Sequence, residues 1–192
     1  MRIIAGQWRG RPLRSLKGDA TRPTTDRVRE ALMSALISAR GPFEGARVLD
    51  AFSGSGALGL EALSRGAQFS LLNEASREAA RVIEGNLSSL GVGREAVRLR
   101  KGDAFTLPTV AGAPFDLIFL DPPYAFEPAR IVSLVAALDE AGLVAEGAVV
   151  CYEHAKKDKA AVEGAVGALQ YRVVSVKDYG DTSITTLRKE AI

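Results

Sequence analysis

The chain has 192 residues and a net charge of +2, and with 47% hydrophobic and 25% charged residues it has the composition of a folded single domain rather than a disordered chain. One Cys and one His exclude an internal disulfide and a thiolate–imidazole zinc site, so we expect no metal. The beginning of the chain lacks the apolar segment of a signal peptide, and no stretch is apolar for long enough to span a membrane, so we expect a cytoplasmic protein.

Basic residues are concentrated in the first 30 positions. This region carries eight basic and three acidic side chains, whereas the rest of the chain carries 17 basic and 20 acidic ones. Seven of the eight are Arg, a side chain suited to bidentate contacts with phosphates. The asymmetry predicts either a segment that binds a polyanion or a solvated basic terminus. Under the first interpretation the candidate contacts are Arg2, Arg9, Arg11, Arg22, Arg27 and Arg29.

The first predicted elements are a hairpin and a helix. Residues 2–13 are expected to form a short hairpin with breaks at its glycines. Positions 24–26 offer side chains that can cap a helix, and apolar residues from 28 to 39 recur at helical spacing until Gly41 ends the pattern. The opposite, polar face of this helix carries Arg27, Arg29 and Glu30.

Strands and helices then alternate along the chain. Strands are predicted at residues 47–52, 69–73, 97–101, 115–120 and 148–152, and helices at residues 57–65, 76–90, 127–140 and 159–169. This alternation predicts an α/β fold with a mostly parallel, doubly wound sheet. Two closing strands at 171–176 and 184–188 leave no room for a helix between them, so they must be antiparallel neighbours. We divide the chain into an N-terminal hairpin–helix extension, residues 1–45, and a core, residues 46–192.

A glycine-rich loop follows the first core strand. Gly54-x-Gly56-x-x-Gly59 matches the dinucleotide fingerprint, but Asp50 would repel a pyrophosphate at this position. S-adenosylmethionine carries no phosphate, and its ammonium and sulfonium groups suit an acidic strand end. The candidate cofactor residues of this loop are Asp50, Phe52, Ser53, Gly54 and Gly56.

Acidic residues also follow the next two strands. Glu74 lies 24 residues after Asp50, a spacing at which a carboxylate commonly accepts the ribose hydroxyls of a nucleoside. Asp103, followed by Ala104, can accept a hydrogen bond from an adenine amino group. The alternatives are a helix-start acid for Glu74 and a turn residue for Asp103. Three acids at consecutive strand ends favour a nucleoside site.

The fourth core strand is followed by Asp121-Pro122-Pro123-Tyr124, the candidate catalytic motif. An exocyclic amine on a nucleobase is a poor nucleophile, and hydrogen-bond acceptors aimed at its N–H bonds direct its lone pair outward. The carboxylate of Asp121 and the carbonyl of Pro122 can supply these acceptors, while Tyr124 can stack on the base. Positioning and electrostatics would then carry the catalysis. The alternative is a rigid exit from a buried strand.

Two other reactive side chains lie near the fifth strand. A covalent route through a thiol would need an activated cysteine, but Cys151 falls within an apolar strand and is expected to be a core side chain. His154 follows that strand and is expected to be exposed or loosely bonded rather than catalytic.

These motifs together resemble the RsmD family, bacterial methyltransferases that act on the N2 amine of one guanine in 16S rRNA. The resemblance includes Arg2-Ile3-Ile4-Ala5-Gly6 with Trp8-Arg9-Gly10, residues 22–32, residues 48–56 and residues 120–124. It implies a Rossmann-like class I methyltransferase fold, with S-adenosylmethionine as the cofactor. It also implies that Asp121 to Tyr124 hold the target amine.

The resemblance further implies that the basic N-terminal segment touches rRNA, in a partly assembled small subunit rather than in naked RNA, and we expect a monomer. Two other functions stay open. One is a DNA or other amine-directed methyltransferase, for example of the adenine N6 type. The other is a non-catalytic RNA-binding assembly factor, which the intact glycine loop and the intact Asp121 motif argue against.

Overall fold

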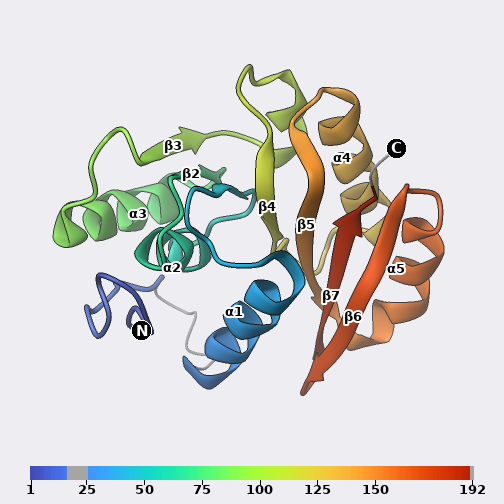
Figure 1. Cartoon of the computed structure of the whole chain (residues 1–192), viewed down its shortest axis with the longest axis horizontal. Helices are drawn as coiled ribbons and strands as arrows, with labels where there is room; N and C mark the ends of the chain where they lie inside the picture. Colours follow the sequence, from blue (N-terminus) through green and yellow to red (C-terminus); the bar gives the residue numbers. More distant parts are fainter. Residues whose placement is uncertain (17–25, 191–192) are drawn as a thin grey trace.

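A computed structural model describes residues 1–16 and 26–190 of the chain. The candidate contact Arg22 and the predicted helix cap at positions 24 and 25 lie outside the described residues. Figure 1 shows a sheet with helices on both faces. In chain order, the elements are α1 (Asp26–Arg40), β1 (Arg47–Asp50), α2 (Ala57–Ser64), β2 (Phe69–Glu74), α3 (Arg77–Leu90), β3 (Val97–Lys101), η2 (Ala104–Thr109), β4 (Phe115–Leu120), α4 (Pro128–Glu140), β5 (Val144–Ala155), η3 (Lys156–Asp158), α5 (Lys159–Val166), β6 (Tyr171–Tyr179) and β7 (Thr182–Lys189).

The sheet has seven strands in the order β3-β2-β1-β4-β5-β7-β6. The first five are parallel, and β7 pairs antiparallel with both β5 and β6. The predicted doubly wound sheet with a closing antiparallel pair is therefore confirmed. The order reverses between β1 and β4, and ligands of such sheets bind beyond the carboxyl ends of the strands at this switch point.

Alternate residues of the central strands enter two separate cores. In β4, Leu117 and Phe119 pack with α1 and α2 on one face, whereas Ile118 and Leu120 pack with α4 and α5 on the other. Because both faces of β4 are covered, its sequence is almost entirely apolar, as expected of a central parallel strand. The two cores fix the sheet rigidly between the helices.

Some boundaries differ from those predicted. β5 begins at Val144, four residues earlier than expected, and its pairing with β4 shifts register around Gly147, which adopts a φ of +70°. The segment around Pro108, for which no helix was predicted, forms the short helix η2, which Asp103 caps by accepting from the amide of Phe105. Irregular strands and capped 3₁₀ turns of this kind leave little periodicity in a sequence.

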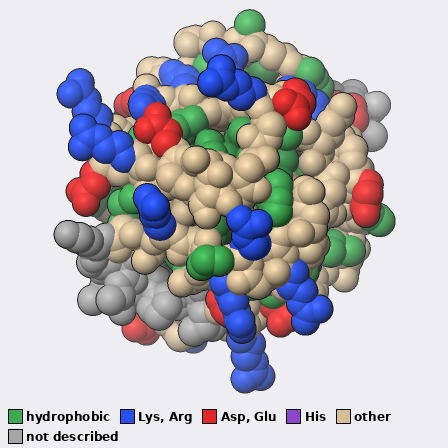
Figure 2. Space-filling view, turned by 90° about the vertical axis from the view of Figure 1, so that its left-hand side faces the viewer, with side chains coloured by type: hydrophobic (Ala, Val, Ile, Leu, Met, Phe, Trp, Pro, Cys, Tyr) green, Lys and Arg blue, Asp and Glu red, His purple; other side chains and the backbone are tan. Residues whose placement is uncertain are grey.

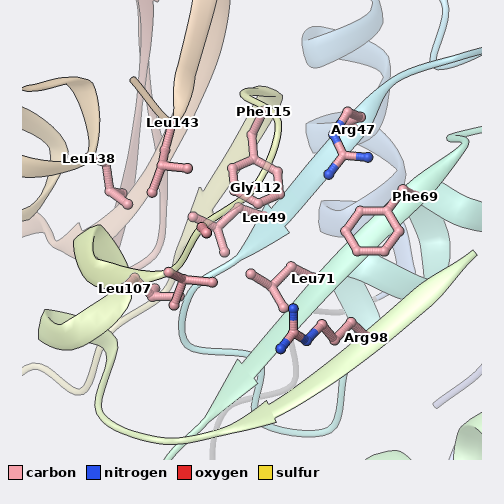
Figure 3. A pocket seen from close by; sticks show the side chains of 12 residues that line it. Arg47, Leu49, Phe69, Leu71, Arg98, Leu107, Gly112, Phe115, Leu138 and Leu143 are labelled. Atoms are coloured by element: carbon pink, nitrogen blue, oxygen red, sulfur yellow. The ribbon is translucent and has the colours of Figure 1, made fainter. Parts of the chain in front are cut away.

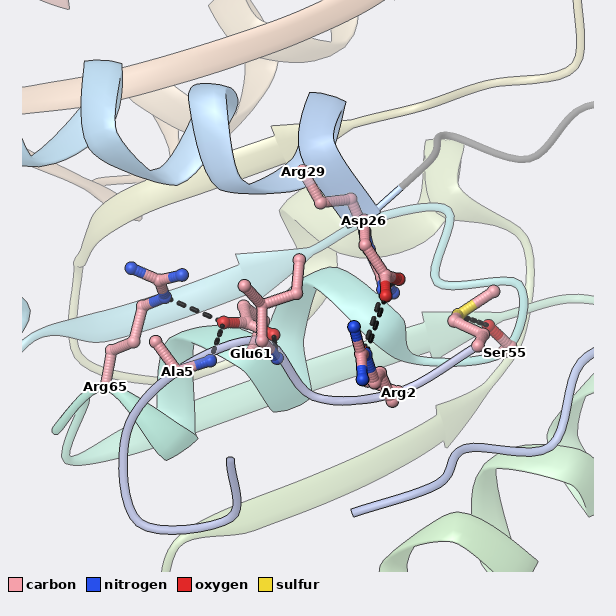
Figure 4. A network of polar contacts seen from close by, with 9 residues as sticks. Arg2, Ala5, Asp26, Arg29, Ser55, Glu61 and Arg65 are labelled. Carbon is pink, nitrogen blue, oxygen red and sulfur yellow. Dashed lines mark hydrogen bonds and ion pairs between the residues drawn. The ribbon is translucent and has the colours of Figure 1, made fainter. Parts of the chain in front are cut away.

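The N-terminal segment, residues 1–16, reverses its direction as predicted. It does so with a single isolated antiparallel bridge, between Arg2 and Pro12, rather than with two regular strands. Its backbone instead binds α2, because both oxygens of the fully buried Glu61 accept amide hydrogen bonds, from Ile4 at 2.8 Å and from Ala5 at 3.1 Å. Arg65 balances the charge of Glu61 with an ion pair of 2.8 Å (Figure 4).

Gly6 makes the closest approach between this segment and α2. It adopts a φ of +83°, and a Cβ atom there would lie 1.7 Å from the carbonyl oxygen of Ser64. The amide of Gln7 donates to that same carbonyl, and the amide of Trp8 donates to the Ser64 hydroxyl. The extension is thus attached to the core through main-chain contacts that only glycine permits at position 6.

The beginning of α1 contains a buried arginine. Arg29 is 2% exposed and donates to the carbonyl of Arg2 and to the carboxylate of Asp26 (Figure 4). Burial acts to raise the pKa of Asp26, but hydrogen bonds and charge from Arg2 and Arg29 outweigh it and lower that pKa. The prediction that Arg29 lies on the polar face of this helix is wrong, because its guanidinium joins α1 to the N-terminal segment.

Within residues 1–16 and 26–190, no helix combines the length and the hydropathy needed to cross a membrane.

Candidate functional site

Three carboxylates from separate strand ends come together at the carboxyl edge of the sheet. Asp50 ends β1, Glu74 ends β2 and Asp121 directly follows β4. Asp50 is 1% exposed, and its burial, together with the negative charges of Asp121 and Glu74, raises its pKa to about 7. A buried acid that is destabilised by two other acids is a favourable place for a cationic ligand.

The glycine loop between β1 and α2 is held in shape by two of these acids. Glu74 accepts from the amide of Gly54 at 2.8 Å, and Asp50 accepts from the amide of Gly59 at 3.1 Å. Gly54 and Gly56 have positive φ angles, and no atom lies within 4 Å of a Cβ placed on Gly54. The backbone at Gly54 is therefore open to a close ligand approach.

Gly59 has a different role from the first two glycines of the motif. A Cβ there would lie 2.3 Å from Leu72 and 2.8 Å from the hydroxyl of Ser70, so this glycine lets α2 pack directly on β2. The hydroxyl of Ser53, a predicted cofactor residue, donates to the Asp50 carbonyl and is buried. Ser53 thus fixes the turn that carries Asp50.

The predicted nucleoside-binding acids have structural bonds as well. Glu74 also accepts from the amide of Ser76 at the start of α3, and Asp103 caps η2. Both alternatives raised from the sequence, a helix-start acid and a turn residue, therefore describe real contacts of these side chains. Asn73 and Arg100 join the two strand ends, because the Asn73 amide donates to Ala51 and Gly102 while Arg100 donates to Asn73. Ala104, the neighbour of Asp103, is buried.

The motif after β4 presents both buried and exposed groups. Pro122 is buried and Asp121 half-buried, whereas Pro123 and Tyr124 are exposed. The hydroxyl of Tyr124 lies 2.8 Å from that of Thr182, the first residue of β7. The antiparallel pair at the end of the chain thereby reaches back to the candidate catalytic motif.

An aromatic cluster that was not predicted lies beside this motif. Phe52 from the glycine loop, Phe105 from η2 and Phe126 after Tyr124 contact one another with ring centroids 5.3–6.2 Å apart. Arg130 on α4 lies over two of these rings, 3.8 Å from the centroid of Phe105. Only Phe52 was singled out from the sequence. Phe126 lies only two residues beyond Tyr124, and this closeness to the candidate catalytic motif was the signal that could have pointed to its ring.

Cys151 and His154 differ from the acids in their surroundings. Cys151 is a buried core side chain as predicted, and burial, with the charges of Glu153, Asp121 and Asp50, raises the pKa of its thiol. The prediction that His154 is exposed or loosely bonded is wrong, because this side chain is buried on β5. Its Nδ1 donates to the Ala155 carbonyl and its Nε2 lies 2.9 Å from the Thr185 hydroxyl, while burial lowers its pKa. Among the described residues, no three His, Cys, Asp or Glu side chains are grouped so that they could hold a metal ion.

A separate cavity of about 120 Å³ lies at the opposite, amino edge of the sheet (Figure 3). Its walls include the first residues of three strands, Arg47, Phe69 and Phe115, and its remaining surface is mainly leucine. The guanidinium of Arg47 lies 4.5 Å from the centroid of the Phe69 ring. None of the predicted site residues lines this cavity.

The predicted polyanion contacts fall into two groups. Arg9, Arg11 and Arg27 are exposed, and Arg2 is exposed but paired with Asp26 at 2.8 Å. Arg29 is buried, so its guanidinium does not face a ligand. Figure 2 shows Lys and Arg side chains spread over the face that carries the N-terminal segment and α3.

Comparison with known proteins gives consistent matches. Residues 1–188 match the family described as conserved hypothetical protein 95. Ribosomal RNA small subunit methyltransferase D of Escherichia coli K12 is 39% identical over 153 residues, which are 80% of this chain and 74% of that protein. YlbH of Bacillus subtilis, described as a candidate rRNA methyltransferase, is 36% identical over 157 residues, 80% of this chain and 82% of that protein. The structure of Escherichia coli yhhF, described as a candidate methyltransferase, has a TM-score of 0.80 at 32% identity and covers 100% of this chain and 99% of that one.

The sheet order, the glycine loop and these neighbours define a Rossmann-like methyltransferase fold. The chain belongs to the conserved hypothetical protein 95 family, which is the RsmD family that its motifs resemble.

Proposed function

We propose that this protein transfers a methyl group from S-adenosylmethionine to the exocyclic N2 amine of a guanine in 16S rRNA. The observation that carries the proposal is the convergence of Asp50, Glu74 and Asp121 beside an exposed Tyr124 at the switch point of the sheet. Relatives described as rRNA small subunit methyltransferases support the RNA substrate. The N2 position is inferred from the family resemblance.

The residues at the carboxyl edge fit S-adenosylmethionine chemically. Burial, and to a smaller extent the charges of Asp121 and Glu74, disfavour the ionised form of Asp50, and the two cationic groups of the ligand would stabilise that form. The uncrowded backbone at Gly54 leaves space for the ligand. We assign Asp50, Phe52, Ser53, Gly54 and Gly56 to this site, with Glu74 for the ribose hydroxyls and Asp103 and Ala104 near the adenine. When bound, S-adenosylmethionine supplies an electrophilic methyl group on its sulfonium.

The Asp121 motif then acts on the nucleophile. In the proposed mechanism, the Asp121 carboxylate and the Pro122 carbonyl accept hydrogen bonds from the two N–H groups of the amine. These bonds direct the lone pair of its nitrogen towards the methyl donor. Tyr124 stacks on the base and holds it in line, with its hydroxyl kept in place by Thr182. The amine becomes acidic only as the new bond forms, so Asp121 can receive the proton without being a strong base beforehand. Catalysis depends mainly on positioning and electrostatics.

The extension, residues 1–45, is proposed to contact rRNA, with Arg2, Arg9, Arg11 and Arg27 as its described basic contacts. Arg22 retains that assignment from the sequence alone. The proposed substrate is a partly assembled small subunit, and the proposed enzyme is a monomer that works in the cytoplasm.

Mapping the methylated nucleotide tests this function directly. The protein is incubated with S-adenosylmethionine labelled in its methyl group and with small subunits purified from a strain that lacks the modification. We expect label on a single guanine, at N2, and none with the Asp121→Ala variant. Label on adenine or on protein, or equal labelling by Asp121→Ala, would overturn the proposal.

A further inference from the structure

Helix α3 carries a regular row of positions that lead away from the carboxyl edge of the sheet. Arg77 and Arg81 occupy its first two turns, and Gly85 and Ser89 follow at the same spacing of four residues. Residues four apart form one ridge on a helix, with about 6 Å between successive members. The row begins three residues after Glu74, so its first arginine lies next to the candidate cofactor site.

The N-terminal segment fills the second half of this ridge with its own arginines. The guanidinium of Arg14 occupies the space beside Gly85, where a Cβ atom would lie 2.9 Å from Nη1. Arg11 donates to the carbonyl of Ser89, one turn further along. Both arginines are exposed, as are Arg77 and Arg81. Two arginines of α3 and two of the N-terminal segment thus lie along one ridge of the helix.

Asn86 fixes the register of this arrangement. Its side chain accepts from the amide of Arg14 at 2.8 Å and donates to the Arg14 carbonyl, and it also donates to the carbonyl of Ser55 in the glycine loop. Asn86 is completely buried, so these bonds are protected from water. The position of Arg14 is therefore set relative to both α3 and the loop.

One of the two acidic residues of α3 is paired with a base outside this row. Glu84 forms an ion pair of 2.6 Å with Lys101 on β3, and Glu78 lies in the first turn, where an acid stabilises the helix dipole. Figure 2 shows basic side chains distributed across this face. The charge of the ridge is complementary to a chain of phosphates.

We infer that the arginine ridge, defined as Arg77, Arg81, Arg14 and Arg11, binds the phosphodiester backbone of the RNA on the side of the target nucleotide next to α3. This inference rests on the proposed function and adds α3 to the surface expected from the N-terminal charge. Arg is suited to this task because its planar guanidinium makes bidentate contacts with phosphate oxygens. The ridge would position the RNA without reading its sequence.

The test measures affinity for small subunits that lack the modification, at several salt concentrations. The variant is Arg77→Gln with Arg81→Gln, and its matched control is Arg172→Gln with Lys177→Gln on the exposed edge strand β6, which removes the same charge. Affinity falls as salt rises, and loss of two phosphate contacts should make the slope of log affinity against log salt less steep by about 1.4–1.8. Affinity at low salt should fall about tenfold or more, whereas the control should match the parent.

Two further variants sharpen the result. Adding Arg14→Gln should make the slope less steep by about a further 0.7–0.9. The variant Arg77→Lys with Arg81→Lys should keep most of the salt dependence because it keeps both charges. A slope for the α3 variant equal to that of the β6 control would overturn the inference, even if the enzyme still methylates guanine. Absence of salt-dependent binding in the parent would contradict the proposed function itself.

Discussion

The hydroxyl of Tyr124 lies 2.8 Å from the hydroxyl of Thr182, so the candidate catalytic motif is hydrogen-bonded to the last strand pair of the sheet. Tyr124 is 38% exposed, and this bond helps to hold its ring in place at the surface. We expect Thr182→Val to lower kcat/KM about 3- to 10-fold, the effect of losing about one hydrogen bond. Affinity for S-adenosylmethionine should stay unchanged.

A double-mutant cycle checks that the loss acts through Tyr124. Tyr124→Phe keeps the ring but removes the hydroxyl, so it should cause a similar loss, and the double variant should lose little more than either single one. Independent, additive losses would show that Thr182 acts by another route.

The raised pKa of Asp50 predicts a specific dependence of stability on pH. In the unfolded chain this carboxyl becomes charged near pH 4, whereas in the folded protein it does so only near pH 7. The free energy of unfolding of the parent, relative to Asp50→Asn, should therefore fall as the pH rises from about 4 to about 7, by at most about 4 kcal/mol. Denaturant titrations at several pH values measure this difference, and a constant difference would contradict the raised pKa.

The same acid should make cofactor binding depend on pH. Protonation of Asp50 removes the negative charge that a cationic ligand needs, so affinity for S-adenosylmethionine should rise from pH 6 to pH 8. Calorimetry at both pH values tests this, with Asp50→Asn as the control that should bind weakly at both. Equal affinity of the parent at both values would place the cationic groups away from Asp50.

Asp121 should affect transfer much more than binding. Because its carboxylate is proposed to contact the amine rather than the cofactor, Asp121→Ala should abolish methyl transfer while affinity for S-adenosylmethionine stays within a few-fold. Single-turnover labelling and calorimetry together separate the two effects. Normal turnover by this variant would exclude the amine contact.

Two glycines with similar backbone angles should tolerate alanine very differently. Gly6 and Gly10 have φ angles of +83° and +81°, but only a Cβ on Gly6 would collide with the backbone of Ser64. We expect Gly10→Ala to cost about 1–2 kcal/mol of stability and Gly6→Ala clearly more, with partial detachment of the N-terminal segment. Thermal denaturation and proteolysis of the segment compare the two variants; equal losses would mean that the contact with Ser64 yields easily.

The sequence was sufficient to predict a mostly parallel sheet with a closing antiparallel strand pair. β4 is apolar because both of its faces are covered, and the short connection between β6 and β7 requires them to pair antiparallel. Asp50, Glu74 and Asp121 were each singled out from the sequence as acids at strand ends, and the structure brings these three together at one edge of the sheet.

The partners that allow Arg29 and Glu61 to be buried could not be read from local patterns. Each charge is stabilised by partners far along the chain, the Arg2 carbonyl in one case and the amides of Ile4 and Ala5 in the other. Glu61 did carry a signal, since it is the single charged residue within the otherwise apolar helix Ala57–Ser64. An acid surrounded by apolar neighbours needs donors, and here the N-terminal backbone supplies them.

The attachment of the N-terminal segment through Gly6 and Glu61 also limits how members of this family can exchange parts. The N-terminal segment binds α2, and α2 begins at the glycine loop. A foreign N-terminal segment without a glycine facing Ser64 would therefore displace α2 and disturb the candidate cofactor site as well. A chimera that takes its first 16 residues from a relative should work only if donor and recipient share both contacts.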